Sequence, residues 1–148
     1  MPNFDPPDPN FEARVRESFE RQRVMETIGA RLKRVEPGEV EIELPFRQDL
    51  TQQHGYLHAG VVTTVVDSAC GYAAMSLTPP GAEIVSVEFK INLLSPATGE
   101  LLVARASVKR AGRNITVCAG DAFMSGGAQD EKLVATMLAT MMTVSGRA

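Results

Sequence analysis

Asp67 is the residue whose type and position point most directly to chemistry, because it is the only charged residue between Ala59 and Ala82. This stretch is otherwise small, apolar or hydroxylated, which predicts a helix buried in the protein. A carboxylate in such a helix is costly unless it is hydrogen-bonded, paired or faces a cavity. Asp67 is therefore either a structural aspartate satisfied by a neighbouring group or a carboxylate that meets a substrate.

Small and hydroxylated residues surround Asp67 on the predicted helix. Thr63 and Thr64 lie one turn before it and Gly71 lies one turn after it, so that they form a narrow polar stripe. A slim substrate could reach the helix along this stripe, and we expect Thr63 to contact it there.

Two glycines, Gly55 and Gly60, flank His58 and Ala59 at the point where the buried helix should begin. Backbone N–H groups at a helix N-terminus lack intrahelical partners and, helped by the helix dipole, bind negative charge. Such a charge develops on the carbonyl oxygen of a thioester under attack, and small residues permit its close approach. The segment therefore predicts an oxyanion site.

His58-Ala59-Gly60, followed by Asp67 nine residues after the histidine and then by Gly71, resembles the signature of hotdog-fold thioesterases of the phenylacetate-degradation type. Ala59 stands where the family usually has its first glycine. The resemblance implies that Asp67 is the general base or the nucleophile, and that the N–H groups of Ala59 and Gly60 polarise the thioester carbonyl. It implies that His58 shapes the helix start, and that the active site lies between two subunits.

The resemblance also implies roles for residues outside the helix. Gln52 stands where many relatives have an asparagine that orients water or substrate, with Gln53 and His54 beside it as rivals for substrate contact. Ser86 stands where some relatives place a hydroxyl near the attacking water.

Later segments extend the likeness. Residues 85–97 are similar to the next strand of the family and residues 110–114 to its following basic turn, so that the resemblance covers roughly residues 36–144. Arg110 and Arg113 in this turn either bind the phosphates of coenzyme A or form a solvated hairpin end.

Two other kinds of site are weaker interpretations of the same residues. His54 and His58 could form a metal site with Asp67, but Gly55 weakens helical geometry there and zinc takes Cys- and His-rich tetrahedral sets. We expect no metal. Cys70 stands among small apolar residues, which favours packing over a nucleophilic role, since free cysteine is commonly buried.

Periodicity predicts the elements that must position these residues. In chain order they are a helix over 10–26, strands over 30–35 and 40–44, a central helix over 59–77, and strands over 84–94, 100–110, 114–123 and 132–144. Asn10 is the expected N-cap of the first helix, and Gly29 marks its exit. Short turns between the last four strands predict that each is the antiparallel neighbour of the next.

One antiparallel sheet wrapped round one long central helix satisfies this order within a single α+β domain. With the resemblance, the prediction is a hotdog fold over residues 10–148 with an additional N-terminal helix, preceded by a flexible lead-in over residues 1–9. The last strand carries more large apolar residues than one face can bury, namely Met137, Leu138, Met141 and Met142. We therefore expect a homo-oligomer, a dimer or a tetramer built from dimers.

Composition narrows the class of protein. The chain has 148 residues, 44% apolar and 22% charged, with a net charge of −3, which disfavours a nucleic-acid binder. Its start has neither a basic nor an apolar segment, and its longest weakly polar stretch is too interrupted to span a membrane. Its two distant cysteines suggest reduced thiols in a cytoplasm.

The predicted function is hydrolysis of an aryl, short-chain or medium-chain acyl-CoA, with no cofactor other than the CoA of the substrate. Two alternatives remain open. A hotdog hydratase or dehydratase would use an aspartate with a histidine, which His58 makes conceivable. A non-catalytic acyl-CoA sensor would have no need for Asp67 in so costly a position.

Overall fold

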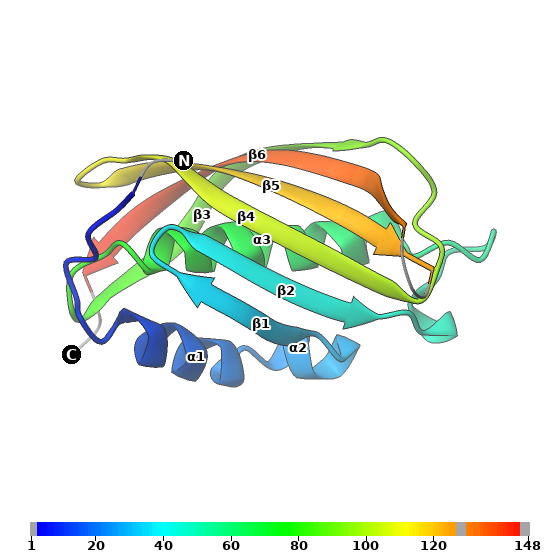
Figure 1. Cartoon of the computed structure of the whole chain (residues 1–148), viewed down its shortest axis with the longest axis horizontal. Helices are drawn as coiled ribbons and strands as arrows, with labels where there is room; N and C mark the ends of the chain where they lie inside the picture. The colour runs from blue at the N-terminus through cyan, green and yellow to red at the C-terminus, as the bar shows by residue number, and fades with distance from the viewer. Residues whose placement is uncertain (1–2, 127–129, 146–148) are drawn as a thin grey trace.

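The computed structural model describes residues 3–126 and 130–145, which form a curved six-stranded antiparallel sheet around a long helix (Figure 1). In chain order the elements are α1 (Phe11–Arg21), α2 (Arg23–Ile28), β1 (Arg31–Glu36), β2 (Glu39–Pro45), the 3-10 helix η1 (Gln48–Leu50), α3 (Ala59–Met75), β3 (Ala82–Leu93), β4 (Leu101–Ala111), β5 (Ile115–Ser125) and β6 (Glu131–Ser145). This arrangement is the hotdog fold, and every predicted strand is present.

The central helix α3 is buried because its apolar side chains meet the sheet along most of its length. Val65, Val66 and Ala69 are fully buried, and strands β2 to β6 all contact the helix. The helix packs tightly against Gly120 of β5, where a Cβ atom would lie 2.8 Å from the Cys70 Sγ. Within the described part of the chain, no helix is both long and apolar enough to cross a membrane.

The strand order is β1-β2-β4-β5-β6-β3, so that the prediction of β3 beside β4 is wrong. The connection from Leu94 to Glu100 instead crosses the end of the sheet, where its two ends bond to Val134 and Ser125. Seven residues can span about 23 Å when extended, which exceeds three inter-strand spacings of about 4.8 Å. The seven-residue connection is therefore long enough to join β3 to β4 although these two strands are not neighbours in the sheet.

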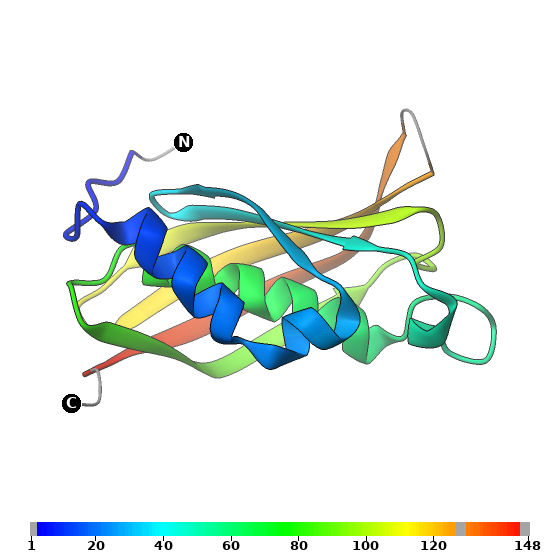
Figure 2. The ribbon, with the colours of Figure 1, turned by 90° about the horizontal axis from the view of Figure 1, so that it is seen from below.

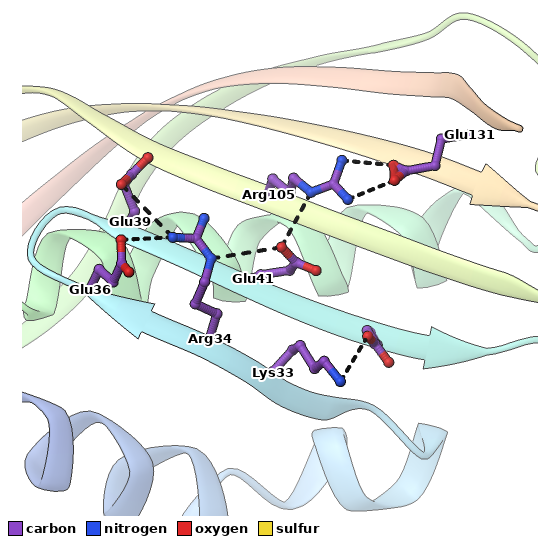
Figure 3. A network of polar contacts seen from close by, with 8 residues as sticks. Lys33, Arg34, Glu36, Glu39, Glu41, Arg105 and Glu131 are labelled. Atoms are coloured by element: carbon purple, nitrogen blue, oxygen red, sulfur yellow. Dashed lines mark hydrogen bonds and ion pairs between the residues drawn. The ribbon is translucent and has the colours of Figure 1, made fainter. Parts of the chain in front are cut away.

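Ion pairs cover the outer face of β1, β2 and β4 (Figure 3). Arg34 and Arg105 approach Glu41 at 3.9 Å and 3.3 Å, and Arg105 makes two bonds of 2.7 Å to Glu131. The other members are Lys33, Glu36, Glu39 and Glu43. Because these pairs are partly exposed, they keep this face polar more than they stabilise the fold.

The two edges of the sheet differ in kind. β1 carries Arg31, Lys33 and Arg34, and charge along an edge opposes pairing with another strand. β3 is twelve residues long and carries apolar side chains that are 42–56% exposed, namely Val85, Val87, Phe89 and Leu93. A long apolar edge of this kind is a template for pairing with a second strand.

The N-terminal helix predicted over residues 10–26 is two helices, because the chain leaves helical geometry at Gln22 (φ −80°, ψ 94°). Asn10 occupies the N-cap position, as predicted, although its side chain makes no capping bond. α2 ends at Gly29 in the left-handed conformation, as predicted. Figure 2 shows α1 crossing in front of α3, and α1 contacts both α3 and β1.

Arg14 of α1 joins the N-terminal segment to the end of α3. Its guanidinium donates to the carbonyl oxygens of Thr78 and Ala82 at 2.9 Å, and its Nε lies 3.0 Å from the Asp8 carboxylate. Carbonyl groups beyond a helix C-terminus lack helical partners, so that Arg14 satisfies groups that would otherwise be buried unpaired. The described part of the expected lead-in thus contacts the domain through Asp8.

We expect Arg14→Leu to lower the free energy of unfolding by about 2–4 kcal/mol, because it removes a mostly buried pair and leaves carbonyl groups unsatisfied. Urea unfolding followed by circular dichroism measures this loss. Arg16→Leu on the same helix breaks only the exposed pair with Glu12 and should cost under about 0.5 kcal/mol. Equal losses in the two variants would contradict the role given to Arg14.

Candidate active site

Asp67 lies at the middle of α3 and faces the first half of β3. The Ser86 hydroxyl donates a hydrogen bond of 2.7 Å to Asp67 Oδ1, which fixes the carboxylate and leaves its second oxygen for another donor. Asp67 is half-buried, and its burial cost is offset by this bond. The structure thus brings together two residues that the sequence predicted for one site.

A β-bulge sets the direction of Ser86. The register of β3 against β6 shifts between Ser86 and Glu88, so that Val87 is the extra residue. Bulges of this kind redirect a side chain and are frequent beside functional sites. Here the bulge lets Ser86 face the helix while the apolar positions beyond it, such as Phe89 and Ile91, also face inward.

A cavity of about 360 Å³ opens beside Asp67. It is lined by Ser18, Arg21, Gln22, Asp67, Ser68, Gly71, Tyr72, Met75, Glu83, Ile84 and Ser86. Its wall therefore comes from α3, from β3 and from the break between α1 and α2. Gly71, which the sequence placed one turn after Asp67, lines it as the polar-stripe interpretation requires.

Gln22 and Tyr72 were not predicted as site residues. The Gln22 side chain lies between α3 hydroxyl groups, accepting from Ser68 at 2.7 Å and donating to Tyr72 at 2.8 Å. The one local signal was the loss of regular apolar spacing after Phe19, where Arg21-Gln22-Arg23 interrupts the helical pattern.

His58 caps the start of α3. Its backbone is extended, and its Nδ1 accepts a hydrogen bond of 2.8 Å from the Gly60 N–H. The Gly60 N–H is therefore engaged within the loop, and the Val61 N–H bonds to the His58 carbonyl. Among the hydrogen bonds of the described residues, the Ala59 N–H donates to none, so that Ala59 is the available oxyanion donor of the two that were predicted.

The threonine hydroxyls of the predicted stripe are used inside the helix. Thr63 and Thr64 donate to the carbonyl oxygens of Ala59 and Gly60, each at 2.7 Å. Bonds of this i→i−4 kind give the two hydroxyl hydrogens an acceptor within the helix. The predicted contact of Thr63 with substrate stays a prediction.

The loop before α3 is held by the side chain of Gln52. Its Oε1 accepts from the His54 N–H at 2.6 Å and from the Tyr56 N–H at 3.3 Å. Gln52 and Gln53 line a second cavity of about 450 Å³, which the helix start, Leu93 and Leu94 also line. His54 does not line it, and its ring lies beside that of Tyr56.

Arg110 and Arg113 lie at the other end of the molecule, at the β4–β5 turn (Figure 1). Arg113 lines a third cavity of about 390 Å³ with Leu77 and Thr143, beyond the C-terminal end of α3. Both arginines are exposed. Within one chain they are not brought together with Gln52, His58 or Ala59, and binding of CoA phosphates stays a prediction.

The structure also bears on the metal site and on the cysteine nucleophile that were weighed against the carboxylate. No group of three or more His, Cys, Asp or Glu side chains among them is arranged to hold a metal ion. Cys70 is fully buried, and burial raises the pKa of its thiol well above its usual range. Burial also raises the pKa of the Cys118 thiol to about 12. Neither thiol is therefore activated as a nucleophile.

The carboxylate and the oxyanion donor of one chain are too far apart to act on one carbonyl group. Ala59 and Asp67 are eight residues apart on one helix, which corresponds to about 12 Å along its axis. They also line different cavities. A general base and an oxyanion donor must both lie within about 3 Å of the reacting atoms.

The six-stranded sheet around one long helix defines a hotdog protein. Residues 54–131, more than half of the chain, match the model of the Thioesterase superfamily, and the chain belongs to that family. The resemblance drawn from the sequence signature is thereby confirmed.

Individual relatives agree with this assignment. The crystal structure of a thioesterase family protein from Silicibacter pomeroyi is 49% identical and superposes with a TM-score of 0.90 over 92% of this chain and 99% of that one. Human acyl-coenzyme A thioesterase 13 is 35% identical over 86 residues, which are 57% of this chain and 61% of that protein. The Escherichia coli PaaI protein, 20% identical, shares the fold with a TM-score of 0.83 over 93% of this chain and 95% of that one.

Replacing His58 tests its capping role. We expect His58→Ala to lower the free energy of unfolding by about 1 kcal/mol, because the Gly60 N–H loses its acceptor. His58→Asn keeps an acceptor at the N-cap and should recover most of this loss. Guanidinium unfolding midpoints measure both effects, and a loss of the same size in His58→Asn would show that the ring does more than cap the helix.

Proposed function

We propose that the protein is an acyl-CoA thioesterase that uses Asp67 as its catalytic carboxylate. The observation that carries the proposal is the Ser86–Asp67 pair, which holds one carboxylate oxygen and leaves the other beside a cavity of about 360 Å³. The name of human acyl-coenzyme A thioesterase 13, a family member, supports CoA thioesters as the substrate class.

In the proposed reaction, Asp67 accepts a proton from water while the water oxygen attacks the thioester carbonyl carbon. The carbonyl oxygen becomes an oxyanion and accepts a hydrogen bond from the Ala59 N–H at the positive end of the α3 dipole. The carbon–sulfur bond then breaks, and the thiolate of coenzyme A takes up the proton. Direct attack by the carboxylate would give a mixed anhydride instead, which water then hydrolyses. Neither route needs a metal or a redox cofactor.

The site is completed by a second copy of the chain in this proposal. Ser86 lies in the first half of β3, and Leu93, the last residue of the strand, lines the helix-start cavity. Antiparallel pairing of two β3 edges would set the Ser86 end of one strand beside the Leu93 end of the other. A two-fold interface repeats each contact, so that two sites form together, each with Asp67 from one chain and Ala59 from its partner.

A tetramer and a cytoplasmic location also belong to the proposal. Ile115, Leu138 and Met142 stay exposed on the outer face of the sheet, and association of dimers would cover them. Two buried free thiols suit a reducing compartment.

We expect Asp67→Asn to lower kcat by about 10²–10⁴, because the amide cannot take up the proton of water. Thiol release from a panel of aryl and alkyl acyl-CoAs measures this rate. Asp121→Asn is the matched control, because Asp121 lies on the outer face of the sheet, bonded to Thr136. An Asp67→Asn variant that is folded and as active as the wild type would rule out the assigned role.

Mixing two inactive variants tests the shared site. Ala59 is the first residue of α3 and His58 is extended, so that Ala59→Pro removes the N–H with little strain. We expect homo-oligomers of Asp67→Asn and of Ala59→Pro each to be nearly inactive. Co-expression of the two chains should restore activity, because mixed dimers have one site with both groups intact. If both groups acted within one chain, the mixed dimers would stay inactive.

A further inference from the structure

α1 runs antiparallel to α3 along the cavity beside Asp67. Near the start of α1, the Arg14 guanidinium donates to the Thr78 carbonyl oxygen at 2.9 Å, beyond the C-terminal end of α3. About two turns later, Gln22 Oε1 accepts from the Ser68 hydroxyl at 2.7 Å, and Ser68 directly follows Asp67. The C-terminal end of α1 therefore lies at the level of Asp67.

Arg21 is the last residue of α1, and it lines this cavity. It follows Arg14 by seven residues and Ser18 by three, so that the three side chains share one face of the helix. This face is turned toward the cavity, because Ser18 also lines it and Arg14 donates to the carbonyl oxygen of Ala82, the first residue of β3. Since Arg21 is exposed, its guanidinium lies at the open side of the cavity.

Among the described residues that line the cavity, Arg21 is the one basic residue, and the acidic ones are Asp67 and Glu83. Ser86 faces Asp67, and the side chains of a strand alternate between its two faces, so that Glu83 points away from Asp67. The burial along β3 agrees with this direction, because Ile84 is half-buried and Glu83 is exposed. Glu83 therefore does not balance the charge of Arg21 within the cavity.

No acidic side chain of the described residues forms an ion pair with Arg21, whereas the two other arginines of α1 are paired. Arg14 pairs with Asp8 at 3.0 Å, and Arg16 pairs with Glu12 at 2.9 Å. The Arg21 guanidinium is thus available to a ligand. Its planar set of N–H donors matches the two oxygens of a carboxylate.

The rest of the cavity suits an acyl group. Apolar and polar atoms share its wall, which comes from Gln22, Ser68, Gly71, Tyr72, Met75 and Ile84. Its volume of about 360 Å³ lies at the lower end of the range for small-molecule sites, which is enough for an acyl group but not for the whole of coenzyme A. With the thioester carbonyl at Asp67, the acyl group would cross the cavity from α3 toward α1, where Arg21 lies.

We propose that Arg21 is a specificity-determining residue that selects acyl groups carrying a carboxylate at their far end. The guanidinium binds this carboxylate through two parallel N–H bonds, and the length of the acyl chain keeps the carboxylate apart from Asp67. A neutral acyl chain leaves the guanidinium in water and makes no such bonds. This selectivity rests on the proposed hydrolysis of acyl-CoA and adds the chemistry of the acyl group to it.

The test compares adipoyl-CoA and suberoyl-CoA, whose acyl groups end in a carboxylate, each with its terminal amide. The amide has almost the same shape and no charge, so that each pair isolates the contact with the guanidinium. We expect wild-type kcat/KM to favour the carboxylate by about tenfold in at least one pair. This preference should shrink as sodium chloride is raised, because Arg21 is exposed.

The outcomes distinguish the selectivity from the hydrolysis. A ratio of kcat/KM values of one or less in both pairs would overturn the selectivity and leave the thioesterase standing. Cleavage of none of these substrates, with no other acyl-CoA of the panel hydrolysed, would overturn both.

Two variants separate the charge of Arg21 from its size. Arg21→Gln keeps a polar side chain without the charge and should bring the ratio of kcat/KM values close to one. Arg21→Glu reverses the charge and should favour hexanoyl-CoA with a terminal trimethylammonium group over adipoyl-CoA. If Arg21→Gln lowered kcat/KM for the carboxylate and for its amide by the same factor, Arg21 would act on coenzyme A, and its selectivity for the acyl group would be overturned.

Arg23→Gln is the matched control, because Arg23 is exposed on α2, two residues after Arg21, and does not line the cavity. Its ratio should equal that of the wild type. Thermal unfolding confirms that each variant is folded. A carboxylate preference that survives in folded Arg21→Gln, or that falls as far in Arg23→Gln as in Arg21→Gln, would exclude Arg21 as its source.

Discussion

A helix that is apolar on nearly every side must be enclosed on nearly every side, and one curved sheet encloses only part of it. The other elements of the fold cover the parts of α3 that the sheet leaves exposed. α1 and α2 cover one of the remaining flanks, with Gln22 bonded to Ser68 and Tyr72 of α3. The flank beside β3 carries Thr64, Asp67 and Gly71 in place of large apolar residues. The candidate chemistry thus lies where the chain leaves its own core open.

The two edge strands of the sheet, β1 and β3, differ in their capacity to pair with another chain. Basic side chains keep the β1 edge from pairing, while β3 keeps an apolar edge beside the open flank of α3. Association through β3 would therefore both bury exposed apolar surface and close the site. Burial of apolar surface and completion of the site would then favour the same contact between two β3 strands. Substitutions in β3 would therefore affect both assembly and activity.

The sequence was sufficient wherever structure depends on neighbours along the chain. Strand periods, the helix start at His58 and the isolated carboxylate Asp67 are all local patterns, and they predicted the strands, the central helix and the carboxylate of the site, whereas Ser86 was predicted only through the family resemblance. The crossing from β3 to β4 was missed because strand order depends on distances in space that a turn length does not determine. The position of the Gln22 side chain was missed because its hydroxyl partners on α3 lie 46 and 50 residues away in the sequence. The bulge at Val87 likewise depends on pairing with β6.

The burial of both cysteines determines how the folded protein reacts with thiol reagents. Cys70 and Cys118 are the only two cysteines of the chain, and both are sealed between α3 and the sheet, with Gly120 in contact with the first. A disulfide reagent in solution therefore finds no accessible thiol on the folded protein. In an assay of the proposed reaction, the colour that it develops would come from released coenzyme A alone. The rate at which the same reagent reacts with the two thiols reports the rate of unfolding, because the thiols become accessible only when the sheet separates from α3.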